Sequence, residues 1–143
     1  MMRTLHIGLR VTDLGHSLTF YQAIGYQVVG TVPRTPIGRL TMLKLPDDEF
    51  VAIELVHDAE PVERGTGLSH LVVKVESMAG TLDALASKGI VPVGPGHERE
   101  DGLVTKVVTD PDGRRIELVQ WPPGHADGMT AADCPDQDGD PHE

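Results

Sequence analysis

The chain carries one pattern twice, and this internal repeat limits its fold more than any other feature. The segment Leu5-His6-Ile7-Gly8-Leu9-Arg10-Val11 matches Ser69-His70-Leu71-Val72-Val73-Lys74-Val75 at an offset of 64 residues, and Ile53-Glu54-Leu55-Val56 matches Ile116-Glu117-Leu118-Val119 at an offset of 63. Each half therefore runs from a strand-like segment with a histidine to a strand-like segment with a glutamate. A repeat of this kind indicates one structural unit used twice.

The residues between these strands predict the same order of elements in both halves. Asp13 and Ser77 are typical helix N-caps, and apolar residues follow each of them at helical spacing. We expect helices from 14 to near Gly25 and from 78 to just before Gly89, with further strands at about 26–32, 39–45, 90–93 and 103–109. Asp110-Pro111-Asp112-Gly113 predicts a tight turn. The sequence thus predicts an α+β fold of two βαβββ modules with mixed sheets.

Composition separates this repeat from the end of the chain. A length of 143 residues with 39% hydrophobic residues suits a single domain with a modest core. The chain has 22 acidic and 12 basic residues, and residues 124–143 hold six of the acids and neither Lys nor Arg. We expect one domain at 1–123, with module 1 at about 3–60 and module 2 at about 67–121. An acidic, disordered tail is expected at 124–143.

Charge and composition also exclude several classes of protein. The net charge of −10 and the five aromatic residues argue against a nucleic-acid surface, and the charge argues against an anionic membrane. No apolar run approaches the roughly 18 residues of a membrane span. The N-terminus leads straight into a strand pattern without the apolar core of a signal peptide. The single cysteine, Cys134, excludes an internal disulfide. We therefore expect a cytoplasmic protein.

Strand alternation predicts a core face and a polar face. The residues of the first strand that we expect to pack beneath the helix are Leu5, Ile7, Leu9 and Val11. The other face of the four repeated strands holds His6, Glu54, His70 and Glu117. If the two polar faces converge, these residues form a cluster that suits one divalent ion such as Ni²⁺, Co²⁺, Zn²⁺, Fe²⁺ or Mn²⁺. If they do not converge, the same residues simply face solvent on a duplicated scaffold.

The repeated motifs resemble those of the vicinal oxygen chelate superfamily, the glyoxalase/bleomycin resistance/dioxygenase group, and within it most closely glyoxalase I. The likeness covers roughly residues 3–121. The motifs that carry it are Leu5-His6-x-x-Leu9-Arg10-Val11-x-Asp13-Leu14-x-x-Ser17-x-x-Phe20-Tyr21, Ile53-Glu54-Leu55, Ser69-His70-Leu71 and Asp110-Pro111-Asp112-Gly113-x-x-Ile116-Glu117-Leu118. The resemblance implies two βαβββ modules around a metal-binding cavity.

The resemblance also implies a reaction and the residues that perform it. His6, Glu54, His70 and Glu117 match the four metal ligands of glyoxalase I, for which Ni²⁺, Co²⁺ or Zn²⁺ is favoured and Mn²⁺ or Fe²⁺ is an option. Glu117 is the first choice for the base that moves the substrate proton, and Glu54 is the second. The implied reaction converts the hemithioacetal of methylglyoxal and glutathione to S-lactoylglutathione through an enediolate.

The positions that bind the thiol in this family are less well matched. Arg10 lies about 13 Å along the strand from His6 and falls where the family contacts glutathione. Asp58 stands where an Asn is usual, and its carboxylate would repel the γ-glutamyl carboxylate. Arg99 is the single base in His97-Glu98-Arg99-Glu100-Asp101, a loop that usually brings a lysine. Arg10, Asp58 and Arg99 are therefore the candidate substrate-binding residues, with the thiol left open.

Other functions of the same superfamily remain open at this point. An epimerase or isomerase acting on another thiol or thioester conjugate would keep the same ligands. A ring-cleaving dioxygenase uses Fe²⁺ with two histidines and one glutamate, so Glu54 as a fourth ligand disfavours it. A drug-binding resistance protein would lack the metal ligands. The resemblance also implies a small-molecule substrate and a homodimer with ligands from both chains, although a two-module chain can instead close its own site.

Overall fold

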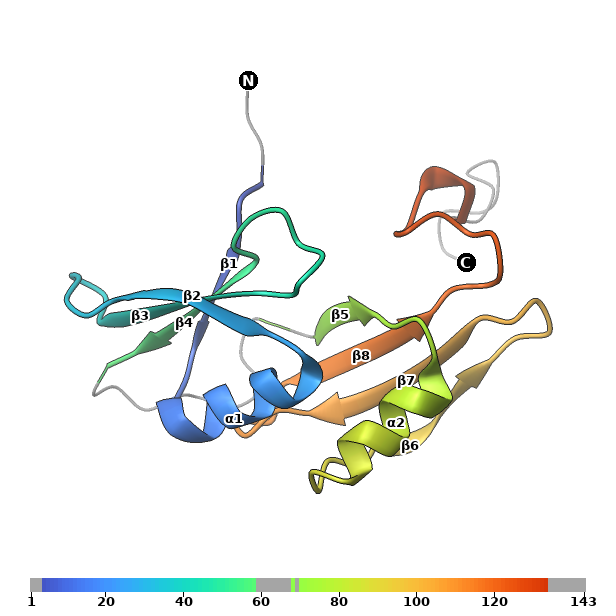
Figure 1. Ribbon diagram of the computed structural model, residues 1–143, viewed down its shortest axis with the longest axis horizontal. Coiled ribbons are helices and arrows are strands. Elements are labelled where there is room, and N and C mark those ends of the chain that lie inside the picture. Colours follow the sequence, from blue (N-terminus) through green and yellow to red (C-terminus); the bar gives the residue numbers. More distant parts are fainter. Residues whose placement is uncertain (1–3, 59–67, 69, 134–143) are drawn as a thin grey trace, which may run out of the picture.

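The structure, a computed structural model, describes residues 4–58, 68 and 70–133 of the chain, and it contains the predicted repeat of elements (Figure 1). The first module contains β1 (Ile7–Arg10), α1 (Leu14–Ile24), β2 (Gln27–Val32), β3 (Arg39–Lys44) and β4 (Ile53–His57). The second contains β5 (His70–Lys74), α2 (Met78–Ala86), β6 (Val93–Glu98), β7 (Val104–Thr109) and β8 (Arg115–Gln120), followed by a short 3-10 helix, η1 (Ala131–Asp133). The order βαβββ, twice, confirms the predicted α+β fold.

Each module forms one mixed four-stranded sheet with the same strand order. The sheets run β1-β4-β3-β2 and β5-β8-β7-β6, and only the pairs β1–β4 and β5–β8 are parallel. In the first parallel pair Gly8 stands opposite Glu54, and in the second Val72 stands opposite Glu117. Each of these partners lies two residues after a predicted histidine ligand. The repeat therefore places the His and Glu of each module at equivalent positions on neighbouring strands.

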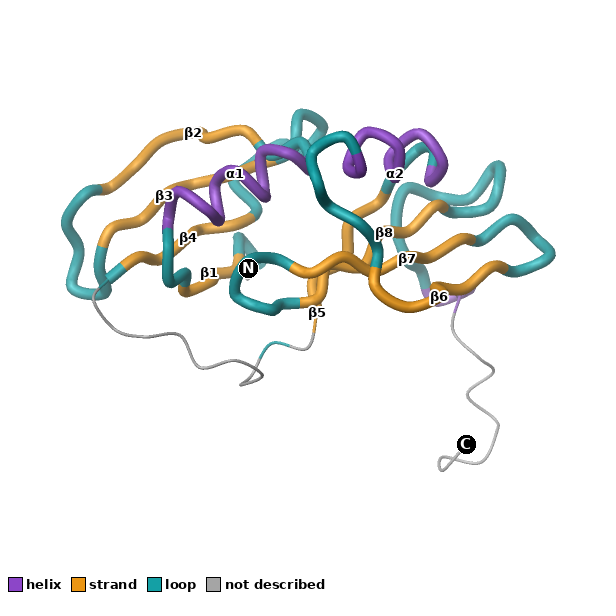
Figure 2. The backbone as a smooth tube through the Cα atoms, turned by 90° about the horizontal axis from the view of Figure 1, so that it is seen from below, coloured by secondary structure: helices purple, strands orange, loops and turns teal. Residues whose placement is uncertain are grey.

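The caps read from the sequence start both helices. The Asp13 side chain accepts a hydrogen bond from the His16 backbone N–H at 2.9 Å, and the Ser77 hydroxyl accepts one from the Gly80 N–H at 3.1 Å. Gly25 ends α1 with a φ of 127°, which a residue with a side chain rarely adopts. Figure 2 shows both helices on the same side of the two sheets. Within the described residues, the opposite face of each sheet carries no α-helix.

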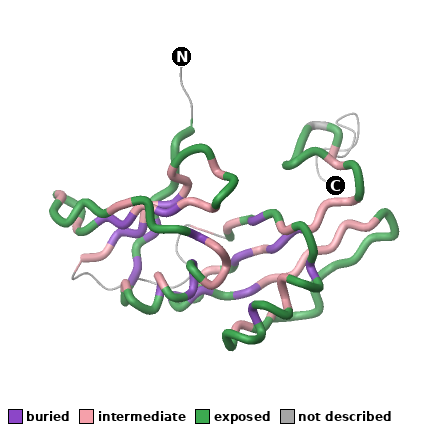
Figure 3. Tube along the Cα trace, viewed as in Figure 1, coloured by how far each residue is buried: buried purple, intermediate pink, exposed green. Residues whose placement is uncertain are grey.

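The core lies between the helices and the central strands, as Figure 3 shows by the buried segments along the strands. Its fully buried members include Tyr21, Leu43, Ile53, Leu55, Leu85, Ile116 and Leu118. Leu9 and Val11 are buried as predicted, but the expectation for Leu5 and Ile7 was wrong, because they are 77% and 44% exposed. The helix α1 lies near the far end of β1 in Figure 1, so it does not cover the start of that strand.

The turn before β8 joins the two modules. Gly113 donates its backbone N–H to the Asp110 carbonyl at 3.0 Å, as the turn motif predicts. Asp110 is only 4% exposed, and its carboxylate accepts hydrogen bonds from the Tyr21 hydroxyl at 2.8 Å and from the Arg114 guanidinium at 3.0 Å. Arg114 also donates to the carbonyl of Arg10 at the end of β1. Burial and the neighbouring carboxylate raise the pKa of Tyr21 well above its usual value.

The ends of the predicted domain are described in part. Residues 124–133, the first half of the expected tail, include η1 and lie beside the second sheet (Figure 1). The disorder predicted for 134–143 concerns residues outside the described part of the chain. Among the described residues, no helix has both the length and the apolar composition needed to cross a membrane.

Candidate functional site

The first His–Glu pair lies at the start of the edge strand of the first sheet and on the neighbouring strand. His6 comes directly before β1, and Glu54 lies on β4. The His6 Nε2 and the Glu54 Oε2 are 2.9 Å apart, and the Glu54 side chain is only 13% exposed. We call His6 and Glu54 the first half-site.

The second His–Glu pair repeats this arrangement with a wider spacing. His70 begins β5, and Glu117 lies on β8. The His70 Nε2 and the Glu117 Oε2 are 3.6 Å apart, and the two side chains are 45% and 31% exposed. We call His70 and Glu117 the second half-site. Its carboxylate is thus more accessible and held less closely by its histidine than the carboxylate of the first.

Each pair fits two ligands of one divalent ion. Donors bound at about 2.1 Å lie about 3.0 to 3.4 Å apart in octahedral and tetrahedral geometry, close to the observed 2.9 and 3.6 Å. A neutral imidazole and a carboxylate are also the donors that first-row divalent ions accept. The structure does not bring the two half-sites together, because the described residues hold no group of three or more His, Cys, Asp or Glu placed to bind a metal. One chain therefore presents two half-sites and not one four-ligand cluster.

The candidate substrate residues of the first module form an ion pair with each other. Arg10, at the end of β1, donates from Nη1 to the Asp58 carboxylate just after β4. Their side chains are 41% and 23% exposed. The sequence placed both residues at the thiol site but did not predict that they would contact each other. The positive charge of Arg10 is therefore paired with the negative charge of Asp58. An anionic substrate that approached Arg10 would meet a base already in an ion pair.

A cavity of about 870 Å³ covers the second half-site. It is lined by His70, Lys74 and Glu117 of the second sheet and by the predicted residue Arg99. The segment after β8, residues 121–133, which we call the C-terminal segment, also lines this cavity. This segment lies over the end of β8 in Figure 1.

The C-terminal segment is held by side chains that the sequence did not single out for this site. The rings of Trp121 and His125 stack with centroids 4.3 Å apart and an angle of 6° between planes. His125 Nε2 lies 2.5 Å from an Asp133 carboxylate oxygen, which raises the pKa of His125 and lowers that of Asp133. Trp121 directly follows β8, and its aromatic character in an aromatic-poor chain was the one available signal.

The basic side chains of this cavity each meet an acid of the same chain. Lys74 Nζ lies 2.8 Å from the Asp127 carboxylate and 2.9 Å from that of Glu76, and these contacts raise the pKa of Lys74 above its usual value. Arg99 Nη2 lies 2.5 Å from the Asp101 carboxylate, which raises the pKa of Arg99 and lowers that of Asp101. Both bases line the cavity with their charges already balanced.

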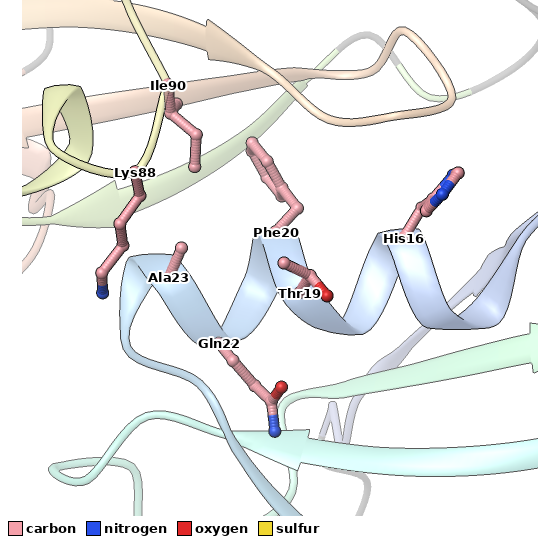
Figure 4. Close-up of a pocket in the computed structure, with 7 residues that line it drawn as sticks. All are labelled: His16, Thr19, Phe20, Gln22, Ala23, Lys88 and Ile90. Carbon is pink, nitrogen blue, oxygen red and sulfur yellow. The ribbon is translucent and has the colours of Figure 1, made fainter.

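Another groove is lined by different residues from those of this cavity. It is a groove of about 540 Å³ between α1 and the segment after α2, and Figure 4 shows Phe20, Lys88 and Ile90 along it. Its lining includes His16 but none of the four predicted metal ligands. The cavity over the second half-site is therefore the better candidate for the chemistry.

Comparisons with known proteins agree with the repeat and its motifs. Residues 3–118 match the model of the Glyoxalase/Bleomycin resistance protein/Dioxygenase superfamily. The chain is 34% identical to a probable lactoylglutathione lyase of Synechocystis sp. over 83% of its own length and 95% of the relative. It is 34% identical to the lactoylglutathione lyase of Haemophilus influenzae over 83% and 93% of the two chains. The trypanothione-dependent glyoxalase I of Leishmania major superposes with a TM-score of 0.66 at 25% identity, covering 84% and 87%.

Proposed function

The chain belongs to the glyoxalase/bleomycin resistance protein/dioxygenase superfamily and is a glyoxalase I-like enzyme, and on this premise we propose the reaction it performs. We propose that it isomerises the hemithioacetal of an α-oxoaldehyde, such as methylglyoxal, and a thiol to the 2-hydroxyacyl thioester. The observation that carries this proposal is the pair of matched His–Glu contacts, one at the same place in each module. Detoxification of methylglyoxal would be its use in the cell.

We assign the metal to the four residues of the two half-sites. His6 and Glu54 would supply two donors, and His70 and Glu117 would supply the other two. A divalent ion, with Ni²⁺, Co²⁺ or Zn²⁺ favoured over Mn²⁺ and Fe²⁺, supplies Lewis-acid polarisation of the substrate carbonyl when bound. Two imidazoles and two carboxylates would balance its charge.

The glutamate of the second half-site is our choice for the base. Glu117 is 31% exposed and lies 3.6 Å from its histidine, whereas Glu54 is 13% exposed and lies 2.9 Å from its own. Glu117 is therefore the carboxylate with more freedom to reach a substrate carbon. It would take the proton from the carbon bearing the hydroxyl and sulfur, leaving the electron pair on the neighbouring carbonyl oxygen as an enediolate. The same carboxylic acid would return the proton to the neighbouring carbon. The hydroxyl proton would pass to the former carbonyl oxygen, so that the carbon bearing sulfur becomes the thioester carbonyl and the neighbouring carbon bears the product hydroxyl.

We further propose that two copies of the chain complete each site. A half-site has only two protein donors, and the first and second half-sites do not meet within the described part of one chain. A homodimer with twofold symmetry would pair the first half-site of one protomer with the second half-site of its partner, and would do so twice.

The experiment that tests the reaction is turnover by metal-reloaded protein. Apo-protein is reloaded with Ni²⁺, Co²⁺, Zn²⁺ or Mn²⁺ and given methylglyoxal with a panel of thiols that includes glutathione, while thioester formation is followed. Turnover that requires the metal and is abolished in Glu117→Gln supports the proposal. Tight metal binding without turnover on any thiol would contradict the reaction, and absence of metal binding would favour a binding protein without catalysis.

A further inference from the structure

The duplication places one basic residue at the same distance from each predicted histidine ligand. Arg10 follows His6 by four residues, and Lys74 follows His70 by four residues. Residues four apart on a strand lie on the same face about 13 Å from each other. In the site of the proposed function, on which this inference rests, both bases would stand where the far end of a long thiol must lie. Their availability therefore decides which charges that thiol can carry.

The base of the first module is already satisfied by its own chain. Arg10 donates to the carboxylate of Asp58, which lies four residues after Glu54, just beyond β4. An arginine whose guanidinium is engaged by a carboxylate offers less to a substrate anion. A substrate carboxylate that approached Arg10 would also meet the like charge of Asp58.

The two bases of the second module that line the cavity, Lys74 and Arg99, also form ion pairs with acids of the same chain. Lys74 contacts Asp127 at 2.8 Å and Glu76 at 2.9 Å, and Asp127 comes from the C-terminal segment that walls the cavity. Arg99 contacts Asp101 at 2.5 Å, and both residues line the same cavity. The two repeat-related bases and the one base of the loop are thus each matched by an acid that this chain provides.

We propose that the thiol partner is less anionic than glutathione, a thiol whose carboxylates are replaced by neutral or cationic groups, and that Asp58 and Asp127 select it. Glutathione carries two carboxylates and one ammonium group. Each of its carboxylates would have to displace an acid of the protein from its base or lie beside that acid. A thiol with amides or amines in their place leaves the ion pairs intact and gains attraction from the surplus acids.

A binding measurement tests this selection without depending on turnover. Trp121 lines the cavity and is the single tryptophan of the chain, so its fluorescence reports occupancy. The Ni²⁺-loaded protein is titrated with S-methylglutathione and with its diamide, which has nearly the same shape but lacks both carboxylates. We expect the diamide to bind about fivefold more tightly or better, the size of one like-charge contact at a hydrated surface.

Three variants assign the selection to its residues. Asp58→Asn and Asp127→Asn should each tighten the binding of S-methylglutathione and bring the ratio of the two affinities toward one. Asp83→Asn is the matched control, because Asp83 is exposed on α2 and does not line the cavity. In that control the ratio should stay at its original value.

Three outcomes would overturn the inference while the proposed reaction stands. The first is equal or tighter binding of S-methylglutathione than of the diamide, and the second is a preference that Asp58→Asn and Asp127→Asn leave unchanged. A fluorescence response to neither peptide would also overturn it. Failure of the reaction itself is detected separately, by the absence of metal-dependent thioester formation with every thiol of the panel.

Discussion

The two half-sites have the same ligands but different surroundings. The first is a close His6–Glu54 contact of 2.9 Å with a largely buried carboxylate, whereas the second is a wider His70–Glu117 contact of 3.6 Å beneath a cavity of about 870 Å³. The C-terminal segment, which follows the second module alone, makes the wall of that cavity. Both half-sites thus have the same donors, while the C-terminal segment adds to the lining of the cavity at the second.

The glutamates provide the largest expected difference between the half-sites. Glu117→Gln should lower kcat about a thousandfold, because an amide cannot take the substrate proton, and a positioned base contributes about 10²- to 10⁴-fold. Glu54→Gln should cost less in kcat and more in metal affinity, because we assign Glu54 to the ion alone. Steady-state kinetics and metal titration of both variants check this assignment. A larger loss of kcat in Glu54→Gln than in Glu117→Gln would reverse the roles.

The turns before β4 and β8 also differ, in the stability that one aspartate of each turn is expected to contribute. Asp110→Asn should lower the free energy of unfolding by about 3 kcal/mol, because it removes the buried charge that pairs with the partly buried Arg114 between the modules. Asp48 occupies the comparable turn of the first module, where its carboxylate accepts from the Leu45 N–H at 2.9 Å. The Lys44 Nζ donates to the Asp48 backbone carbonyl at 3.2 Å, a contact that a side-chain substitution leaves in place. Asp48→Asn should therefore cost about 1 kcal/mol or less. Urea denaturation of both variants measures the difference, and similar losses would remove Asp110 as the link between modules.

The smallest expected effect is a pH dependence in the C-terminal segment, which lines the cavity over the second half-site. Asp133 raises the pKa of His125 above the usual 6.5, so the ion pair is present at low pH and is lost as the pH rises through that raised value. Protonated His125 stacked on Trp121 quenches its fluorescence, so emission should increase with pH and have a midpoint above 6.5. Asp133→Asn should move the midpoint down. An unchanged midpoint in that variant would show that Asp133 does not raise the pKa of the titrating group.

Local features of the fold could be predicted from the sequence because their causes are local. The N-caps Asp13 and Ser77 mark the starts of both helices, and the alternation around Ile53 and Ile116 identifies strands with one buried face. The strand β6 was placed too early, at 90–93 instead of Val93–Glu98. Gly94 and Gly96 hide this strand, because their positive φ values and the register shift beside them do not resemble a regular strand.

The parts that sequence could not give depend on residues far apart in the chain. Asp110 was correctly placed in a turn, but its contact with Tyr21 requires knowing how the modules pack. The exposure of Leu5 depends on how far along β1 the helix α1 packs against the sheet. The equivalence of the His–Glu pairs was visible in the repeat, whereas their separation into two half-sites was not, because a repeat carries no information on which copies face each other.

The pairing of half-sites from two chains is tested most directly by complementation. His6→Ala and Glu117→Ala chains, with different affinity tags, are produced separately and together, and metal-dependent turnover is compared. If each site joins a first half-site to the second half-site of the partner, the mixed dimer has one intact site and one doubly altered site. Random pairing then predicts about one quarter of the original activity, against none for either variant alone. Mixed dimers no more active than the separate variants would show that each chain completes its own site.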